Sequence, residues 1–114
     1  MHITVEWLQG YLYSAKVTGE SYKLTLPIPP IALYNGNSIS VQASATAYSQ
    51  PRTMKHAAYT KVECGYPSTM HGIEHIERWA EDSSNPLGTV YPYTDIQAVV
   101  DYINANGGVH VHTG

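Results

Sequence analysis

The stretch SISVQASAT, residues 38–46, alternates between apolar and small polar residues along its whole length. A period of two is typical of a strand that buries one face and exposes the other. The Asn-Gly pair at residues 35–36, just before the stretch, is a turn signal. We therefore expect a strand with an inward face of Ile39, Val41, Ala43 and Ala45 and an outward face of Ser40, Gln42 and Ser44.

Further strands are expected on both sides of this stretch. Residues 3–7 alternate, and residues 11–18 and 21–28 are typical of a hairpin. Residues 56–64 predict another strand, and GVHVH, residues 108–112, predicts a short last one. The chain thus predicts a mainly antiparallel sheet of about five to six strands, a common sheet size.

The second half of the chain changes to a helical period. Ser68 or Thr69 could cap a helix that runs to about Glu81. Thr94 could cap a second helix, which ends at the Asn-Gly-Gly sequence of residues 106–108 because glycine readily adopts the left-handed conformation of a helix terminus. The apolar stripe of this second helix consists of Ile96, Val99, Val100 and Ile103. The expected fold class is α+β, a mainly antiparallel sheet followed by two C-terminal helices.

The composition limits the classes of protein to which this chain can belong. A chain of 114 residues predicts a single domain with one modest core, so a subunit contact is a natural place for a pocket and we expect a homo-oligomer. No apolar run approaches the ~18 residues of a membrane span, so we expect no membrane partner. The only cysteine, Cys64, indicates a reducing, intracellular compartment.

Charge is distributed unevenly over the chain, whose net charge is −3. Residues 21–62 hold Lys23, Arg52, Lys55 and Lys61 and no acidic residue. A short basic segment in an acidic protein indicates a local anion site rather than the broad basic face that duplex nucleic acid needs. There are also ten Tyr and no Phe, and tyrosine suits interfaces and ligand pockets because it joins an apolar ring to a polar hydroxyl.

The sequence MHGIEH, residues 70–75, contains His-x-x-Glu-His, the inverted signature of a zinc hydrolase. In that interpretation His71 and His75 would bind the metal and Glu74 would be the general base. On a helix, however, Ile73 would face the core and both histidines would face away from it. This spacing favours an ordinary solvent-exposed helix face.

A catalytic zinc ion also needs a third protein ligand besides the two histidines. The motif is similar to that of S-ribosylhomocysteine lyases, in which a cysteine from later in the chain completes the site, but Cys64 precedes the motif here. His110 and His112 lie two residues apart and could complete a site instead. A zinc-dependent hydrolase or lyase therefore stays an alternative, and we expect neither a resident metal nor another cofactor.

The segment over residues 40–68 combines cations with aromatic side chains. It carries three of the six Lys and Arg residues together with His56, and Tyr48, Tyr59 and Tyr66 are interleaved with them. Arginine binds phosphate through two parallel hydrogen bonds, and aromatic rings provide faces on which a base can stack. The segment therefore predicts a site for a planar, phosphate-bearing molecule, although a polar hairpin loop with tyrosines at its edge would have the same composition.

Three sequences in a fixed order, ISVQASATAYSQPR, YTKVECGYPS and WAED…NPLGTVYPYTDIQAVVDYINANGG, lie within residues 38–108. This ordered set resembles a family of small phage proteins, the anti-Thoeris sponges of the first described type. The resemblance implies a protein that is not an enzyme, and that binds the cyclic ADP-ribose signal of bacterial TIR-domain defence proteins and keeps it intact in the host cytoplasm. It also implies a homo-oligomer with pockets at subunit contacts, and for the wider class it extends the ligands to cyclic oligonucleotides.

The resemblance also implies roles for particular residues. Arg52, in the Pro-Arg loop, would be the phosphate ligand, and Tyr48 would stack on the base or donate a hydrogen bond to a phosphate. Tyr91 and Tyr93, just before the last helix, would form a wall for the adenine. The expected ligand-binding set is completed by Gln42, Ser44 and Tyr59. A protein-binding inhibitor or phage accessory protein, with a tyrosine-rich interface, is the alternative from a different class.

Overall fold

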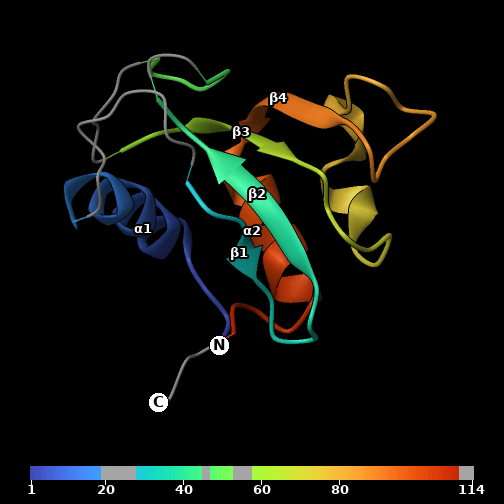
Figure 1. The fold of residues 1–114 in the computed structure, drawn as a ribbon, viewed down its shortest axis with the longest axis horizontal. Coiled ribbons are helices and arrows are strands. Elements are labelled where there is room, and N and C mark those ends of the chain that lie inside the picture. The colour runs from blue at the N-terminus through green and yellow to red at the C-terminus, as the bar shows by residue number, and fades with distance from the viewer. Residues whose placement is uncertain (19–27, 45–46, 53–57, 111–114) are drawn as a thin grey trace.

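An antiparallel sheet flanked by two α-helices forms the body of the protein in this computed structural model (Figure 1). The structure describes residues 1–18, 28–44, 47–52 and 58–110. The strands lie in the order β1 (Ile31–Ala32), β2 (Ser38–Gln42), β3 (Lys61–Gly65) and β4 (Val90–Asp95), and each adjacent pair is antiparallel. The helices are α1 (Val5–Thr18) and α2 (Ile96–Ala105). The α+β class is confirmed, with slightly fewer strands than expected in the described part of the chain.

Strand β2 follows the alternation that its sequence predicts. Ile39 and Val41 are fully buried, whereas Ser40 and Gln42 are partly exposed on the other face. The predicted turn before β2 is also present, and Gly36 has a φ of 88°, which glycine adopts without steric cost. The last two residues of the expected strand lie outside the described part of the chain.

The N-terminal segment forms helix α1, so the expectation of strands there was wrong. The hydroxyl of Thr4 accepts a hydrogen bond from the amide of Trp7 at 3.1 Å, as the capping residue of a helix does. Leu8 and Leu12 lie four residues apart, which places them on one face of α1, and both are fully buried. The alternation over residues 3–7 is too short to outweigh this helical spacing.

Two single turns of 3-10 helix, η1 (Ile73–His75) and η2 (Glu77–Trp79), replace the helix expected over residues 68–81. Gly72 precedes η1 with a φ of 84°, a left-handed conformation that interrupts a right-handed helix. A Cβ atom at Gly72 would lie 3.0 Å from the side chain of Ala105, at the end of α2. The prediction of one continuous helix was wrong because the chain turns at this glycine where it meets α2.

Helix α2 buries the apolar stripe that the sequence predicts. The buried stripe consists of Ile96, Val99, Val100 and Ile103. Thr94, the expected cap, is instead a buried residue of β4 whose hydroxyl donates a hydrogen bond to the carbonyl of Tyr91 at 2.8 Å, and the helix begins after Asp95. Gly107 and Gly108 have φ values of 87° and 85°, which confirms the expected left-handed helix terminus.

The chain returns to the sheet beside β1 after α2. Val109 forms an isolated antiparallel bridge with Leu33, and the amide of His110 donates a hydrogen bond to β1 at 2.9 Å. The remainder of the expected last strand, and most of the strand expected over residues 21–28, lie outside the described residues. Neither of the two α-helices in the described ranges has the length and apolar character that crossing a membrane requires.

Tyrosine fills core positions that phenylalanine takes in many proteins. Tyr59, Tyr91 and Tyr102 are all fully buried. The hydroxyl of Tyr91 donates a hydrogen bond to the carbonyl of Pro86 at 2.6 Å, and that of Tyr102 donates one to the carbonyl of Thr69 at 3.0 Å. Burial raises the pKa of Tyr91 and that of Tyr102 to about 12. These two hydroxyls are therefore neutral hydrogen-bond donors at physiological pH.

Candidate functional site

Two tyrosines and an arginine, from the loop between β2 and β3 and from β4, meet on the surface. The ring centroids of Tyr48 and Tyr93 lie 5.8 Å apart, and the ring planes are tilted by 42°. The guanidinium of Arg52 lies over the Tyr48 ring, 5.1 Å from its centroid. The two tyrosines are 42% and 41% exposed, and Arg52 is exposed as well, so the group is open to solvent. We call these three residues the aromatic–arginine platform.

A β-bulge in β4 places Tyr93 in the platform. Pro92 and Tyr93 of β4 both stand opposite one residue of β3, Glu63. Proline suits a bulge because it has no N–H group to give to the ladder of the sheet. Tyr93 has a φ of 52°, a left-handed conformation that is uncommon for a residue with a side chain. Its amide donates a hydrogen bond to the carbonyl of Tyr48 at 3.0 Å, so the backbones of the two tyrosines are fixed to each other.

Hydrogen bonds also hold the loop that carries Tyr48 and Arg52. The amide of Tyr48 donates to the carboxylate of Glu63 at 3.1 Å, and the amide of Gln50 donates to β3 at 2.9 Å. Ser49 is buried, and its hydroxyl lies 3.2 Å from each of two carbonyl oxygens of the same loop. The platform thus stands on a fixed backbone, which lowers the entropy lost when a ligand binds.

Arg52 is a cation that this site can offer to a ligand. Within the part of the chain that the structure describes, no carboxylate forms an ion pair with Arg52, whose recorded contact is the Tyr48 ring. Lys61 of β3, in contrast, is paired with Asp95 across the sheet. The guanidinium can offer hydrogen-bond donors to an incoming anion, and its position over the Tyr48 ring holds it at the platform.

Gln42 and Ser44, which we expected among the ligand residues, form hydrogen bonds with backbone groups of the protein itself. The side chain of Gln42 accepts a hydrogen bond from the amide of Ile28 at 2.8 Å and donates one to the carbonyl of the same residue at 2.7 Å. The hydroxyl of Ser44 accepts a hydrogen bond from the amide of Ala47 at 3.1 Å. Because both side chains support local backbone, we do not include them in the platform.

Tyr59 and Tyr91, also among the expected ligand residues, lie in the core with no exposed surface. A ligand could reach either ring only if the core opened. The expected residues that the structure brings together at the surface are therefore Tyr48, Arg52 and Tyr93.

The two histidines of the His-x-x-Glu-His sequence lie close to hydrogen-bonding groups of the protein itself. His71 Nε2 lies 3.0 Å from the carbonyl oxygen of Ala105, at the end of α2, and His75 Nε2 lies 4.0 Å from the carboxylate of Glu74. Both histidines are exposed whereas Ile73 is buried, as the sequence predicts. Over the described ranges, no three His, Cys, Asp or Glu side chains are grouped closely enough to hold a metal ion.

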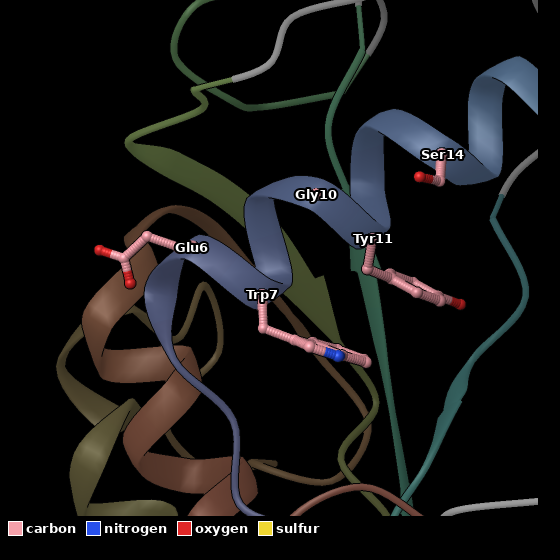
Figure 2. Close-up of a pocket in the computed structure, with 5 residues that line it drawn as sticks. All are labelled: Glu6, Trp7, Gly10, Tyr11 and Ser14. Carbon is pink, nitrogen blue, oxygen red and sulfur yellow. The ribbon is translucent and has the colours of Figure 1, made fainter.

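A pocket lies along one face of α1 (Figure 2). It is an open pocket of about 450 Å³ lined by Glu6, Trp7, Gly10, Tyr11 and Ser14. The rings of Trp7 and Tyr11 are stacked, with centroids 5.4 Å apart and planes 8° from parallel, and burial raises the pKa of Tyr11. Both rings point to one side of the helix while Glu6 points away from them (Figure 2). Among its described lining residues, Glu6 is the one charged side chain and it points away from the two rings (Figure 2). The platform, which combines rings with a cation, is therefore the better candidate site.

Sequence reasoning missed Glu63, whose carboxylate lies against the Tyr48 amide. The signal was present in the alternation of β3, because Val62 and Cys64 are buried and the residue between them must face outward. The bulge had a signal as well, since Pro92 interrupts an otherwise regular strand.

No family model, curated protein or solved structure matches this chain. The resemblance to the anti-Thoeris sponges therefore stays a prediction, and the geometry of the platform has to support any function on its own.

Proposed function

We propose that this protein binds a cyclic ADP-ribose-type nucleotide on the aromatic–arginine platform and sequesters it unchanged. The observation that carries this proposal is the exposed Arg52, whose guanidinium lies over the Tyr48 ring beside the second open ring of Tyr93. The ordered resemblance within residues 38–108 supports the same class of ligand.

The side chains of the platform suit two different parts of a nucleotide. The planar guanidinium of Arg52 can donate two parallel hydrogen bonds to phosphate oxygens. The ring of Tyr48 or Tyr93 can stack on the base, an interaction worth roughly 1–3 kcal/mol. Because the two ring planes are tilted by 42°, a base would stack on one ring and meet the edge of the other.

The expected affinity is high enough for sequestration. A ligand with about 35 heavy atoms, at roughly 0.3 kcal/mol per atom, reaches a binding free energy of about 10 kcal/mol. This value corresponds to a dissociation constant on the order of tens of nanomolar. The platform is open, so one subunit would cover only one side of such a ligand. We therefore propose that a second copy of the chain covers the other side, in a homo-oligomer.

We propose sequestration rather than turnover because the platform consists of groups that stack and pair with charge. Cleavage of a pyrophosphate requires a positioned nucleophile together with a general base or a metal ion. Tyr48, Arg52 and Tyr93 provide binding and orientation instead.

Retention of intact ligand tests this function. The protein is mixed with glyco-cyclic ADP-ribose or with cyclic ADP-ribose, separated from unbound ligand by gel filtration, and heated, and the supernatant is analysed by chromatography. Intact ligand that is released only by heating supports the proposal. Chemically altered ligand would contradict sequestration and return attention to His71, Glu74 and His75. Absence of any ligand would contradict nucleotide binding and favour a protein partner.

A further inference from the structure

The carboxylate of Glu63 lies at the base of the aromatic–arginine platform. One of its oxygens accepts the hydrogen bond from the Tyr48 amide at 3.1 Å, and the residue stands opposite the bulge that carries Tyr93. Glu63 is partly exposed, on the outer face of β3. No further partner of its second oxygen is found among the residues that the structure describes. A carboxylate oxygen has lone pairs for more than one donor, so Glu63 can accept hydrogen bonds from a ligand.

Among the described residues around the platform, the charges cancel. Lys61 shares the outer face of β3 with Glu63 but is paired with Asp95, so it adds no net charge. Arg52 contributes one positive charge and Glu63 one negative charge. A bare polyphosphate would therefore meet a site that attracts it through Arg52 and repels it through Glu63. Such a repulsive element is a common source of specificity.

We propose that Glu63 is a specificity residue that accepts hydrogen bonds from the ribose hydroxyls of the bound nucleotide and disfavours bare phosphates. This inference rests on the proposed function, because it assumes that a phosphate lies on Arg52 and a base on the tyrosines. Acidic side chains bind ribose hydroxyls in dinucleotide-binding proteins by the same chemistry. The arrangement selects a ligand that brings an anion and a hydrogen-bond donor together.

The test compares the wild-type protein with the variant Glu63→Gln. The amide oxygen of glutamine can still accept the hydrogen bond from Tyr48, so the loop keeps its support while the charge is removed. Dissociation constants are measured by calorimetry for cyclic ADP-ribose, for analogues that lack the 2′ and 3′ hydroxyls of either ribose, for the hypoxanthine analogue, and for pyrophosphate.

We expect one deoxyribose analogue to bind the wild-type protein about tenfold more weakly than cyclic ADP-ribose, since a hydrogen bond to a charged acceptor is lost. In Glu63→Gln this difference should shrink to about twofold, because a neutral acceptor contributes less. Pyrophosphate should bind Glu63→Gln at least as tightly as it binds the wild-type protein, since the repulsion is gone. A merely structural role of Glu63 would weaken all ligands together.

Four results would overturn the inference. If both deoxyribose analogues bind the wild-type protein as tightly as the parent ligand, Glu63 does not contact ribose. If the hypoxanthine analogue binds the wild-type protein more weakly than cyclic ADP-ribose does, and this difference disappears in Glu63→Gln, then Glu63 contacts the base instead of the ribose. If neither cyclic ADP-ribose nor glyco-cyclic ADP-ribose binds the wild-type protein, the proposed function falls, and the role of Glu63 falls with it. Tight binding that depends on Arg52 but not on Glu63 would leave the function standing and remove only the inference.

Discussion

At the scale of single residues, the backbone of Tyr93 is strained at an exposed position. Its φ of 52° costs on the order of 1 kcal/mol or more for a residue with a side chain. The ring is 41% exposed, so the strained residue still presents part of its aromatic surface to solvent. Strained residues of this kind cluster at binding sites and active sites. Tyr66 shares the strain, so the position of Tyr93 beside Tyr48 is what supports a role for Tyr93 in ligand binding.

Replacing Tyr93 by glycine should separate stability from binding. In Tyr93→Gly the left-handed conformation becomes easy, but the partly buried ring is lost and glycine adds entropy to the unfolded chain. We therefore expect the free energy of unfolding in urea to change by no more than about 1 kcal/mol. Loss of the ring should weaken binding of the cyclic ADP-ribose-type ligand by at least about tenfold, as the loss of a stacked base would. Urea denaturation and calorimetry measure the two effects.

Tyr66 provides the matched control for this variant. It has a φ of 50° and is 58% exposed, but it is not part of the platform. We expect Tyr66→Gly to relieve a similar strain and to bind the ligand as the wild-type protein does. Equal loss of binding in both glycine variants would argue against a specific role for Tyr93.

At the scale of elements, the parts that were predictable are those in which one pattern dominates. Strand β2 and helix α2 each show an unbroken period, and tertiary packing uses the face that the period marks. In α1 a short alternation at the start competes with the helical spacing of Leu8 and Leu12. The alternation is the weaker of the two signals, and it wrongly predicts a strand. The break at Gly72 depends on the closeness of α2, a long-range contact that no local pattern records.

The candidate site was predictable in part for a similar reason. The cations and tyrosines of residues 40–68 indicated the segment that holds Tyr48 and Arg52, whereas the role of Tyr93 was implied only by the family resemblance. Composition could not separate these open rings from the buried ring of Tyr59, because tyrosine suits both environments. Nor could it place the bulge, which depends on the register between β3 and β4.

Gly72 tests the packing between η1 and α2. In Gly72→Ala the backbone would keep a φ of 84°, which is unfavourable for alanine. The added Cβ would also lie 3.0 Å from the Ala105 side chain. We expect a loss of roughly 2 kcal/mol in the free energy of unfolding, measured in urea. The matched control is Gly36→Ala, with a φ of 88° and nothing within 4 Å of the added Cβ, which should lose only about 1 kcal/mol. Equal losses would show that η1 can move away from α2 without cost.

At the scale of the whole molecule, the buried tyrosines connect stability to alkaline pH. Burial raises the pKa of Tyr91 and of Tyr102 from the ordinary value of 10.0 to about 12. Between these values the unfolded chain releases protons that the folded chain retains. Their contribution to stability is therefore fully present below about pH 10 and is lost as the pH rises toward 12. We expect the urea midpoint to fall between pH 10 and pH 11.

Two variants check the origin of this pH dependence. Tyr102→Phe removes one titrating hydroxyl, so the urea midpoint of this variant should fall less steeply above about pH 10. The lost hydrogen bond to Thr69 should also lower the free energy of unfolding by about 1 kcal/mol at every pH. Tyr34→Phe changes a residue that is 69% exposed and should keep the wild-type slope. A wild-type midpoint that stays constant from pH 8 to pH 11 would contradict the account of the core.

The central claim is that the aromatic–arginine platform binds a nucleotide through Arg52, and calorimetric titration with glyco-cyclic ADP-ribose tests it most directly. The chain offers a matched control, because Arg78 lies over the ring of Trp79 at 5.0 Å, much as Arg52 lies over Tyr48 at 5.1 Å. We predict that Arg52→Ala binds at least about tenfold more weakly than the wild-type protein, whereas Arg78→Ala stays within about twofold of it. Unchanged affinity in Arg52→Ala, or an equal loss in both variants, would contradict the claim.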